Sequence, residues 1–212
     1  MAVDAVMTAP PYWDDACKHL MKKDRVMKRL IPQFGQACLH SRGDAFVTLA
    51  RSVVGQQISV KAAQTVWDRF IKLPAQLTPQ QVLRLKIDDM RAAGLSARKV
   101  EYLVDLALHF DNELVHVDAW AGMDDQAIID ELVAIRGIGR WTAEMFLIFH
   151  LMRPDVLPLD DVGLINGISK CYFSGDAVSR SDAREVALAW APYRTVATWY
   201  IWRSLDPLPV SY

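Results

Sequence analysis

Hydrophobic residues recur at helical spacing through almost the whole chain, and no segment alternates between apolar and polar positions as a half-buried strand does. This periodicity predicts helices over residues 11–23, 24–34, 59–70, 97–110, 125–135, 181–190 and 193–204. Further helices are predicted to begin after Asp44, Thr78, Gly139 and Asp160. The pattern therefore indicates an all-α protein.

Residues that start or interrupt helices divide the chain further. Ser59 suits the N-cap of the helix that follows it, and Pro79 suits a first helical position, where no backbone donor is needed. Pro154 and Pro158 do not fit inside a helix, so residues 153–159 are predicted to form an extended connector. The next helix is predicted to begin directly after this connector.

Gly137 and Gly139 stand between two predicted helices, with Ile138 between them. Glycine lets the backbone turn sharply and leaves the first amides of the second helix accessible to a phosphate oxygen. A dinucleotide-binding loop matches poorly, because no strand precedes these glycines and the third glycine of that motif is missing. Taken alone, the stretch is either a phosphate-binding hairpin or an ordinary turn of a helix bundle.

The composition limits which kinds of protein this can be. The chain has 212 residues, 52% of them hydrophobic, which suffices for one compact domain or two small ones. Cys17, Cys38 and Cys171 are too few for a four-cysteine iron–sulfur cluster or a paired zinc motif, and we expect them to be buried and reduced. With no basic leader and no membrane-spanning apolar run, the expected location is the cytoplasm. The formal net charge of -1 argues against a broad basic surface, so any DNA contact must be local.

Several segments together resemble the helix-hairpin-helix DNA glycosylase superfamily, and within it the DNA-3-methyladenine glycosylase II (AlkA-type) family. They cover residues 51–63, 94–99, 132–143, 157–161 and 190–202, in the order that the family has them. The resemblance implies a glycosylase of base excision repair that flips an alkylated purine, such as 3-methyladenine, out of duplex DNA and hydrolyses its N-glycosidic bond. Its expected partner is double-stranded DNA containing alkylated bases, on which it acts as a monomer.

The resemblance places the catalytic carboxylate at Asp161, twenty residues after Trp141. A fixed anion there stabilises the oxocarbenium-like sugar of the transition state and orients the attacking water. Helix capping is the alternative role for this aspartate, and it is the role we expect for Asp160. Bifunctional members of the superfamily carry a nucleophilic lysine at the position of Trp141, so this chain is expected to lack abasic-site lyase activity.

Tryptophans are candidates for the base pocket because aromatic faces attract cationic bases. The resemblance places Trp141 and Trp202 in this pocket, and Tyr12 and Trp13 are further candidates from the N-terminal segment. Tryptophans at helical spacing also fill cores, and we assign this role to Trp67, Trp190 and Trp199.

Gln57 matches the family's wedge position, where a side chain fills the gap that a flipped base leaves in the stack. The alternative for both Gln56 and Gln57 is that they are merely polar residues of the loop. Met145 and Val162 stand where relatives place pocket aromatics, so the range of accepted lesions stays open.

The resemblance also assigns contacts to the glycine hairpin. Backbone contacts to DNA phosphate are expected at Gly137, Ile138, Gly139 and Thr142. A structural monovalent cation would be held by the carbonyls of Val133, Ile135 and Gly137. No cofactor is expected to be required, and no iron–sulfur cluster is expected.

We expect residues 1–212 to form a single glycosylase unit with two helical lobes around a cleft. Residues 45–150 would form the hairpin-bearing lobe, and residues 1–44 with 160–212 the second. A non-catalytic helix-hairpin-helix DNA-binding module would explain the glycine turn but not the positions of Asp161 and Trp202. A helical protein-interaction domain would explain only the periodicity.

Overall fold

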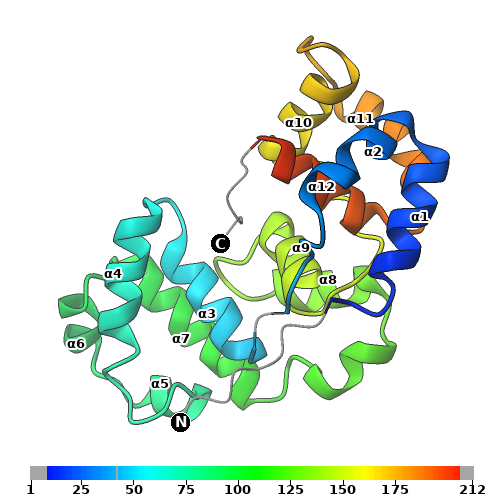
Figure 1. The fold of residues 1–212 in the computed structure, drawn as a ribbon. Helices are drawn as coiled ribbons and strands as arrows, with labels where there is room; N and C mark the ends of the chain where they lie inside the picture. The colour runs from blue at the N-terminus through cyan, green and yellow to red at the C-terminus, as the bar shows by residue number, and fades with distance from the viewer. Residues whose placement is uncertain (1–8, 42, 206–212) are drawn as a thin grey trace. The chain divides into compact units, whose positions relative to one another are not determined.

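The computed structural model describes residues 9–41 and 43–205, and within these ranges the chain is helical with no strand (Figure 1). This confirms the predicted all-α class. The elements are α1 (Trp13–Lys23), α2 (Arg25–Leu30), η1 (Ile31–Phe34), α3 (Ala45–Gly55), α4 (Val60–Phe70), α5 (Pro79–Leu83), α6 (Ile87–Ala92), α7 (Ala97–Asp111), η2 (Val117–Gly122), α8 (Asp125–Val133), α9 (Arg140–Phe149), α10 (Val162–Tyr172), α11 (Arg180–Val186), η3 (Ala187–Trp190) and α12 (Arg194–Leu205).

The observed boundaries differ from the predicted ones mainly where a helix tightens at its end. The predicted helix over residues 24–34 is α2 followed by the 3₁₀ helix η1, which has a proline at its start. The predicted helix over residues 125–135 ends at Val133, because the chain then turns into the hairpin. Ser59 caps α4 as predicted, and α5 begins at Pro79 as predicted, with Thr78 as its cap. Each capping side chain accepts a bond from a backbone amide three residues on.

The chain folds as two compact units. The first unit contains residues 9–41 and 147–205, and the second contains residues 43–146. The first unit is therefore built from both ends of the chain, while the second is one continuous segment.

α12 is the central helix of the first unit. Its residues from Thr195 to Trp202 are all buried, so this stretch has no solvent-facing side. The helix contacts α1, α2, α10 and η3. Trp13 of α1 packs edge-on against Trp199 with ring centroids 5.3 Å apart, so both are core residues.

A buried polar group ties α2 to the C-terminal part of this unit. Asp24 caps α2 through Oδ1, and its Oδ2 accepts hydrogen bonds from the Tyr172 hydroxyl at 2.7 Å and from Trp190 Nε1 at 3.0 Å. Burial raises the pKa of Tyr172, which keeps its hydroxyl a donor. Trp190 is fully buried and is a core residue, as predicted.

α7 organises the second unit, where it contacts α3, α5 and α6, while α4 packs on α3. Trp67 of α4 is buried, which confirms its predicted place in the core. Glu131 of α8 holds η2 by accepting bonds from Trp120 Nε1 at 2.9 Å and His116 Nδ1 at 2.6 Å. Burial acts to raise the pKa of Glu131, but these donors outweigh it and the net pKa is lowered.

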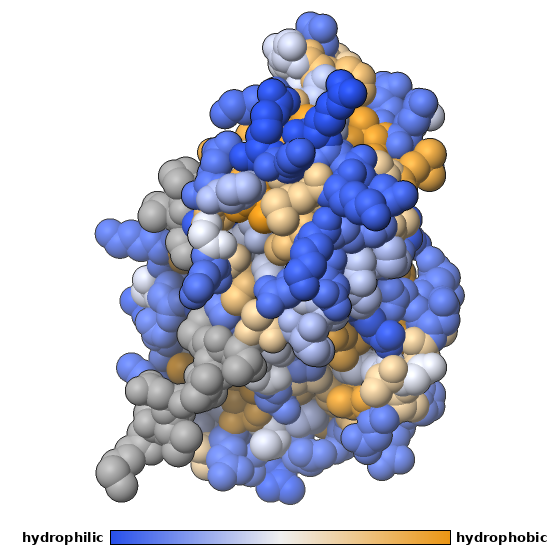
Figure 2. Space-filling model, turned by 45° about the vertical axis from the view of Figure 1, so that its right-hand side comes forward, coloured by the Kyte–Doolittle hydropathy of each residue, from blue (hydrophilic) through white to orange (hydrophobic). Residues whose placement is uncertain are grey.

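On the face drawn in Figure 2, hydrophilic side chains dominate and hydrophobic ones are scattered among them. Exposed apolar residues include Ile58 in the turn between α3 and α4, Val60 at the start of α4, and Val162 at the start of α10. In the described segments no helix has the length and apolar character needed to cross a membrane.

Candidate functional site

Asp161 lies at the N-cap of α10, the helix that follows the proline-containing connector. Its Oδ1 accepts a hydrogen bond from the Leu164 amide at 2.6 Å, and the residue is 5% exposed. Asp160, which we expected to be a cap, instead forms an ion pair with Arg180 at 2.6 Å. The correction follows from the backbone, because Asp161 is the last extended residue before the helix and only its side chain reaches back to the free amides.

The indole of Trp202 donates a second hydrogen bond to the same oxygen, with 2.7 Å between Nε1 and Oδ1. The Trp202 ring also stacks on Phe149, with centroids 5.8 Å apart and an interplanar angle of 11°. Trp202 is 3% exposed. The ring is therefore fixed by both its face and its edge, and it holds the carboxylate of Asp161 in one orientation.

Two glycines four residues apart let α10 approach α12 closely enough for this contact. A Cβ at Gly163 would lie 3.1 Å from Asp161 Oδ1 and 3.3 Å from Trp202 Cδ1. A Cβ at Gly167 would lie 2.2 Å from Ile201 Cγ2. Because residues at this spacing share one helix face, the two glycines form a flat surface against which α12 packs.

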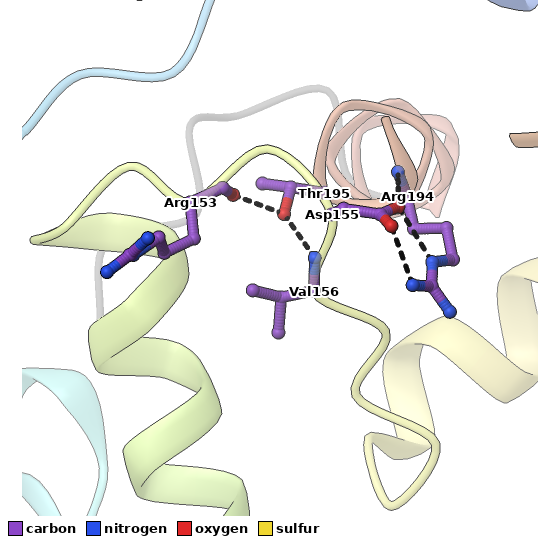
Figure 3. Close-up of polar contacts among 5 residues, drawn as sticks. All are labelled: Arg153, Asp155, Val156, Arg194 and Thr195. Atoms are coloured by element: carbon purple, nitrogen blue, oxygen red, sulfur yellow. Dashed lines mark hydrogen bonds and ion pairs between the residues drawn. The ribbon is translucent and has the colours of Figure 1, made fainter. Parts of the chain in front are cut away.

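The connector that leads to Asp161 is fastened to the start of α12 (Figure 3). Arg194 forms a bidentate contact with Asp155, with Nε–Oδ1 and Nη2–Oδ2 distances of 2.7 and 2.6 Å. The Thr195 hydroxyl donates to the carbonyl of Arg153 at 2.6 Å and accepts from the amide of Val156 at 2.9 Å. Within the connector, the backbone bonds are short turns from Leu159 to Leu157 and from Asp161 to Pro158, so these side chains supply the long-range contacts that fix its path toward Asp161.

In the second unit, the hairpin between α8 and α9 depends on Gly137. This residue has a φ of +86°, and a Cβ there would lie 2.3 Å from Cδ2 of Tyr102. We expected both glycines to be needed for the turn, but Gly139 is not. Its φ is not positive, and a Cβ there would meet nothing within 4 Å. Gly137 therefore shapes the hairpin, while Gly139 keeps its outer surface open.

Some backbone amides of the hairpin already have hydrogen-bond acceptors within the protein, and others do not take part in the helix ladder. The amide of Ile138 donates to the Ile135 carbonyl at 3.1 Å, so it already has an acceptor within the turn. The first backbone bond of α9 runs from Ala143 to the Gly139 carbonyl, and the amide of Thr142 precedes this ladder. Among the predicted phosphate contacts, the Ile138 amide is thus less suited than those at the helix start.

The turn between α3 and α4 carries Gln57, the predicted wedge. Gln57 is exposed and adopts a left-handed conformation with a φ of +58°. Gln56 is half-buried, and its Nε2 donates to the Gly137 carbonyl at 2.9 Å. Lys99 Nζ donates to the Val54 carbonyl at 2.7 Å, and burial lowers the pKa of this lysine.

Comparison with known proteins shows which family has this arrangement. The family model described as HhH-GPD superfamily base excision DNA repair protein matches residues 50–192. The chain is 33% identical over 193 residues to DNA-3-methyladenine glycosylase 1 of Schizosaccharomyces pombe. The aligned region covers 88% of this chain and 85% of that protein. A crystal structure of a DNA-3-methyladenine glycosidase from Bacillus halodurans is similar with a TM-score of 0.85 and 34% identity, covering 94% of this chain and 91% of the other. The Schizosaccharomyces pombe 3-methyladenine DNA glycosylase in complex with abasic DNA has a TM-score of 0.80 and 31% identity, covering 92% of this chain and 100% of the other.

The chain belongs to the HhH-GPD superfamily of base excision DNA repair proteins. The predicted family resemblance and the helix-hairpin-helix fold are thereby confirmed. In this HhH-GPD chain, Asp161 and Trp202 meet within the first unit, while Gln57 and the hairpin belong to the second.

The remaining predicted residues have the following surroundings. Trp141 is half-buried in the first turn of α9, and Met145 is buried further along the same helix. Val162 is 71% exposed beside Asp161. Tyr12 stacks on Tyr193 and donates its hydroxyl to the Met152 carbonyl at 2.6 Å, so its polar end is already used.

The cysteines are more exposed than expected. Cys17, Cys38 and Cys171 are free, as expected, but they are half-buried rather than buried. Over residues 9–41 and 43–205, no three His, Cys, Asp or Glu side chains come together as a metal site.

Sequence reasoning missed the residues that support the site. The i, i+4 spacing of Gly163 and Gly167 was a readable signal of close helix packing. No local pattern pairs Asp155 with Arg194, which are 39 residues apart and meet only through the fold. Lys99 is the last residue of segment 94–99, which resembles the family, but the sequence does not show which group its ammonium binds.

Proposed function

We propose that this HhH-GPD protein is a DNA-3-methyladenine glycosylase that releases alkylated purines from duplex DNA by hydrolysis and has no lyase activity. The observation that carries the proposal is the buried carboxylate of Asp161, which is held by the Trp202 indole and the Leu164 amide. The relatives described above are named as 3-methyladenine glycosylases or glycosidases. A non-catalytic DNA-binding module would not need a dry, oriented carboxylate, so the catalytic function is favoured.

The chemistry follows from the charge of the substrate. As the bond between C1′ and the purine nitrogen lengthens, its electron pair goes to the base, and positive charge develops on the sugar. Asp161 stabilises this charge and takes a proton from the water that attacks C1′. The products are the free base and an abasic site. An alkylated purine is already cationic and leaves as a neutral molecule, so one carboxylate suffices without a strong general acid.

The hairpin and wedge would supply the grip on DNA. We propose that the start of α9, with Gly137, Ile138, Gly139 and Thr142, binds backbone phosphate, and that Gln57 enters the stack where the base has left. Trp141 and Trp202 would favour a cationic base through their aromatic faces. The enzyme would act as a monomer in the cytoplasm.

A monovalent cation is compatible with the hairpin carbonyls. The carbonyl of Ile135 accepts from Ile138 and that of Gly137 accepts from Gln56, which leaves each a second lone pair for a metal ion. With Val133, these oxygens would hold the cation, which would supply local positive charge toward a phosphate.

The decisive experiment replaces the charge of Asp161 while keeping its hydrogen bonds. In Asp161→Asn the amide oxygen still accepts from Leu164 and Trp202, and asparagine is a good N-cap, so the fold should persist. Release of free methylpurine from alkylated duplex DNA should be abolished, while binding to an abasic-site duplex should remain. The matched control is Asp160→Asn, which removes only an exposed ion pair and should keep full activity.

Two further measurements separate the parts of the proposal. Borohydride should trap no covalent adduct between the wild-type protein and DNA, because no lysine occupies the position of Trp141. A trapped adduct would contradict the absence of lyase activity. Gly139→Ala meets nothing inside the protein, so weaker binding to all duplexes alike would support an external phosphate contact at the hairpin.

A further inference from the structure

The turn between α3 and α4 holds a backbone conformation that its sequence does not favour. Gln57 has a φ of +58°, a left-handed conformation that costs free energy for a residue with a side chain. No glycine occupies this position to relieve the cost. Interactions from the surrounding structure must therefore maintain it.

Two side-chain donors hold the chain on the N-terminal side of Gln57. Lys99 Nζ binds the Val54 carbonyl, which lies in the last turn of α3 and has no partner within the helix. Among the described residues, this carbonyl is the only hydrogen-bond acceptor of the lysine ammonium. The cation also suits the negative end of the helix dipole.

Gln56 fastens the next residue to a different element. Its amide nitrogen donates to the carbonyl of Gly137, so the turn is tied directly to the hairpin between α8 and α9. On the other side of the turn, Ser59 caps α4. Gln57 is thus presented outward between anchored neighbours, with the exposed side chain of Ile58 beside it.

We propose that Lys99 and Gln56 are positioning residues that hold the turn of Gln57 ready for insertion into DNA and fix its spacing from the hairpin. The inference rests on the proposed function, in which Gln57 fills the gap left by the flipped base. A wedge on a mobile loop would lose conformational entropy at the moment of insertion, and a held wedge loses less. Holding the wedge in place should increase the rate of base excision most where the damaged base is stacked and paired, because such a base is the hardest to flip.

The test compares two substrates that differ only in how much flipping costs. One carries the alkylated base in a fully paired duplex, and the other carries the same base in a mismatched bulge where it is already unstacked. Lys99→Met and Gln56→Leu should lower single-turnover excision from the paired duplex by about tenfold and leave excision from the bulge within about threefold. Lys72→Met and Gln76→Leu change the same side chains at exposed positions of the second unit and serve as matched controls.

A double-variant measurement asks whether these residues act through Gln57. In a Gln57→Ala background, Lys99→Met should cause little further loss on the paired duplex, because nothing is left to position. Additive losses, or equal losses on both substrates, would overturn the inference and indicate a general structural role. Lys99→Arg retains a donor and should keep most of the wild-type preference.

Hydrogen exchange provides a readout that needs no catalysis. Amides of residues 55–59 should exchange faster in Lys99→Met and Gln56→Leu than in the wild type, and unchanged exchange would refute the holding role. If the wild-type protein released no base from either substrate, the proposed function would fail, and exchange would still decide whether the turn is held. Thermal melting identifies any variant that has lost its fold.

Discussion

Replacing Trp202 by phenylalanine tests how far catalysis depends on the orientation of Asp161. The substitution removes the indole N–H that donates to Oδ1 at 2.7 Å, while an aromatic ring remains to stack on Phe149. The Leu164 amide still binds the same oxygen at 2.6 Å, so the helix cap survives. The perturbation therefore removes one donor to Oδ1 and leaves the Leu164 amide in place.

The size of the effect follows from the kind of hydrogen bond. A bond to a charged group contributes about 1.5 to 3 kcal/mol, which corresponds to roughly 10- to 150-fold in rate if it is expressed only in the transition state. The remaining cap bond limits how far the carboxylate can turn. The lost donor also leaves more negative charge on the oxygen, which favours the reaction. Both considerations place the expected loss near tenfold, at the lower end of the range.

The assay is single-turnover release of methylpurine, together with binding to an abasic-site duplex, which presents no base to stack. Trp199→Phe is the matched control, because Trp199 lies on the same helix and contacts Trp13 and Tyr200 but makes no contact with Asp161 through its indole N–H. Trp202→Phe should slow base release about tenfold more than this control, with little change in abasic-site binding. Equal rates in the two variants would refute a supporting role for the indole donor.

Three other substitutions probe the packing beside Asp161, the connector, and the contact of Glu131 with η2 in the second unit. Gly163→Ala gains about 1 kcal/mol of helix propensity, yet its Cβ would press on the Asp161 carboxylate and the Trp202 indole. Thermal stability should therefore hold while the rate of base excision falls about tenfold. Gly122→Ala, which has open space around its Cβ, is the control, and parallel losses of stability and activity in Gly163→Ala would contradict this account. Asp155→Asn breaks the bidentate contact with Arg194, and denaturant unfolding should show a loss of about 1 kcal/mol or less because the pair is partly exposed. The pKa of Glu131 is lowered in the folded state, so its contribution to the free energy of unfolding should be complete above its ordinary pKa and be lost as pH falls through the lowered pKa. In Glu131→Gln, the free energy of unfolding should depend less on pH over this acidic range.

The helices were predictable because their signals are local. Apolar spacing predicted that the helices exist, and local signals such as Ser59 at an N-cap and Pro79 at a first helical position predicted where two of them begin. The 3₁₀ segment η2 was not predicted, since it is held by Glu131 from a later helix and has no period of its own. Helix propensity depends on the local sequence, so it cannot predict a segment that is held by a side chain of another helix.

The candidate site was predictable only where a family position marks a residue. Asp161 and Trp202 were predicted in this way and lie in contact, but that Asp161 rather than Asp160 caps α10 was not predicted. Two neighbouring aspartates at a helix start are equivalent as a pattern. What separates them is the backbone path of the connector, which depends on the contact between Asp155 and Arg194 far along the chain.

The cap position also explains how a buried carboxylate is tolerated before any substrate arrives. An ionised group removed from water is costly unless hydrogen bonds replace its hydration, and Asp161 receives two of them on Oδ1. One comes from a backbone amide that α10 would otherwise leave without a partner, so the helix gains as much as the carboxylate does. The other comes from a ring already fixed by Phe149. The interactions that stabilise the fold at this point are therefore the same ones that orient the carboxylate for the proposed reaction.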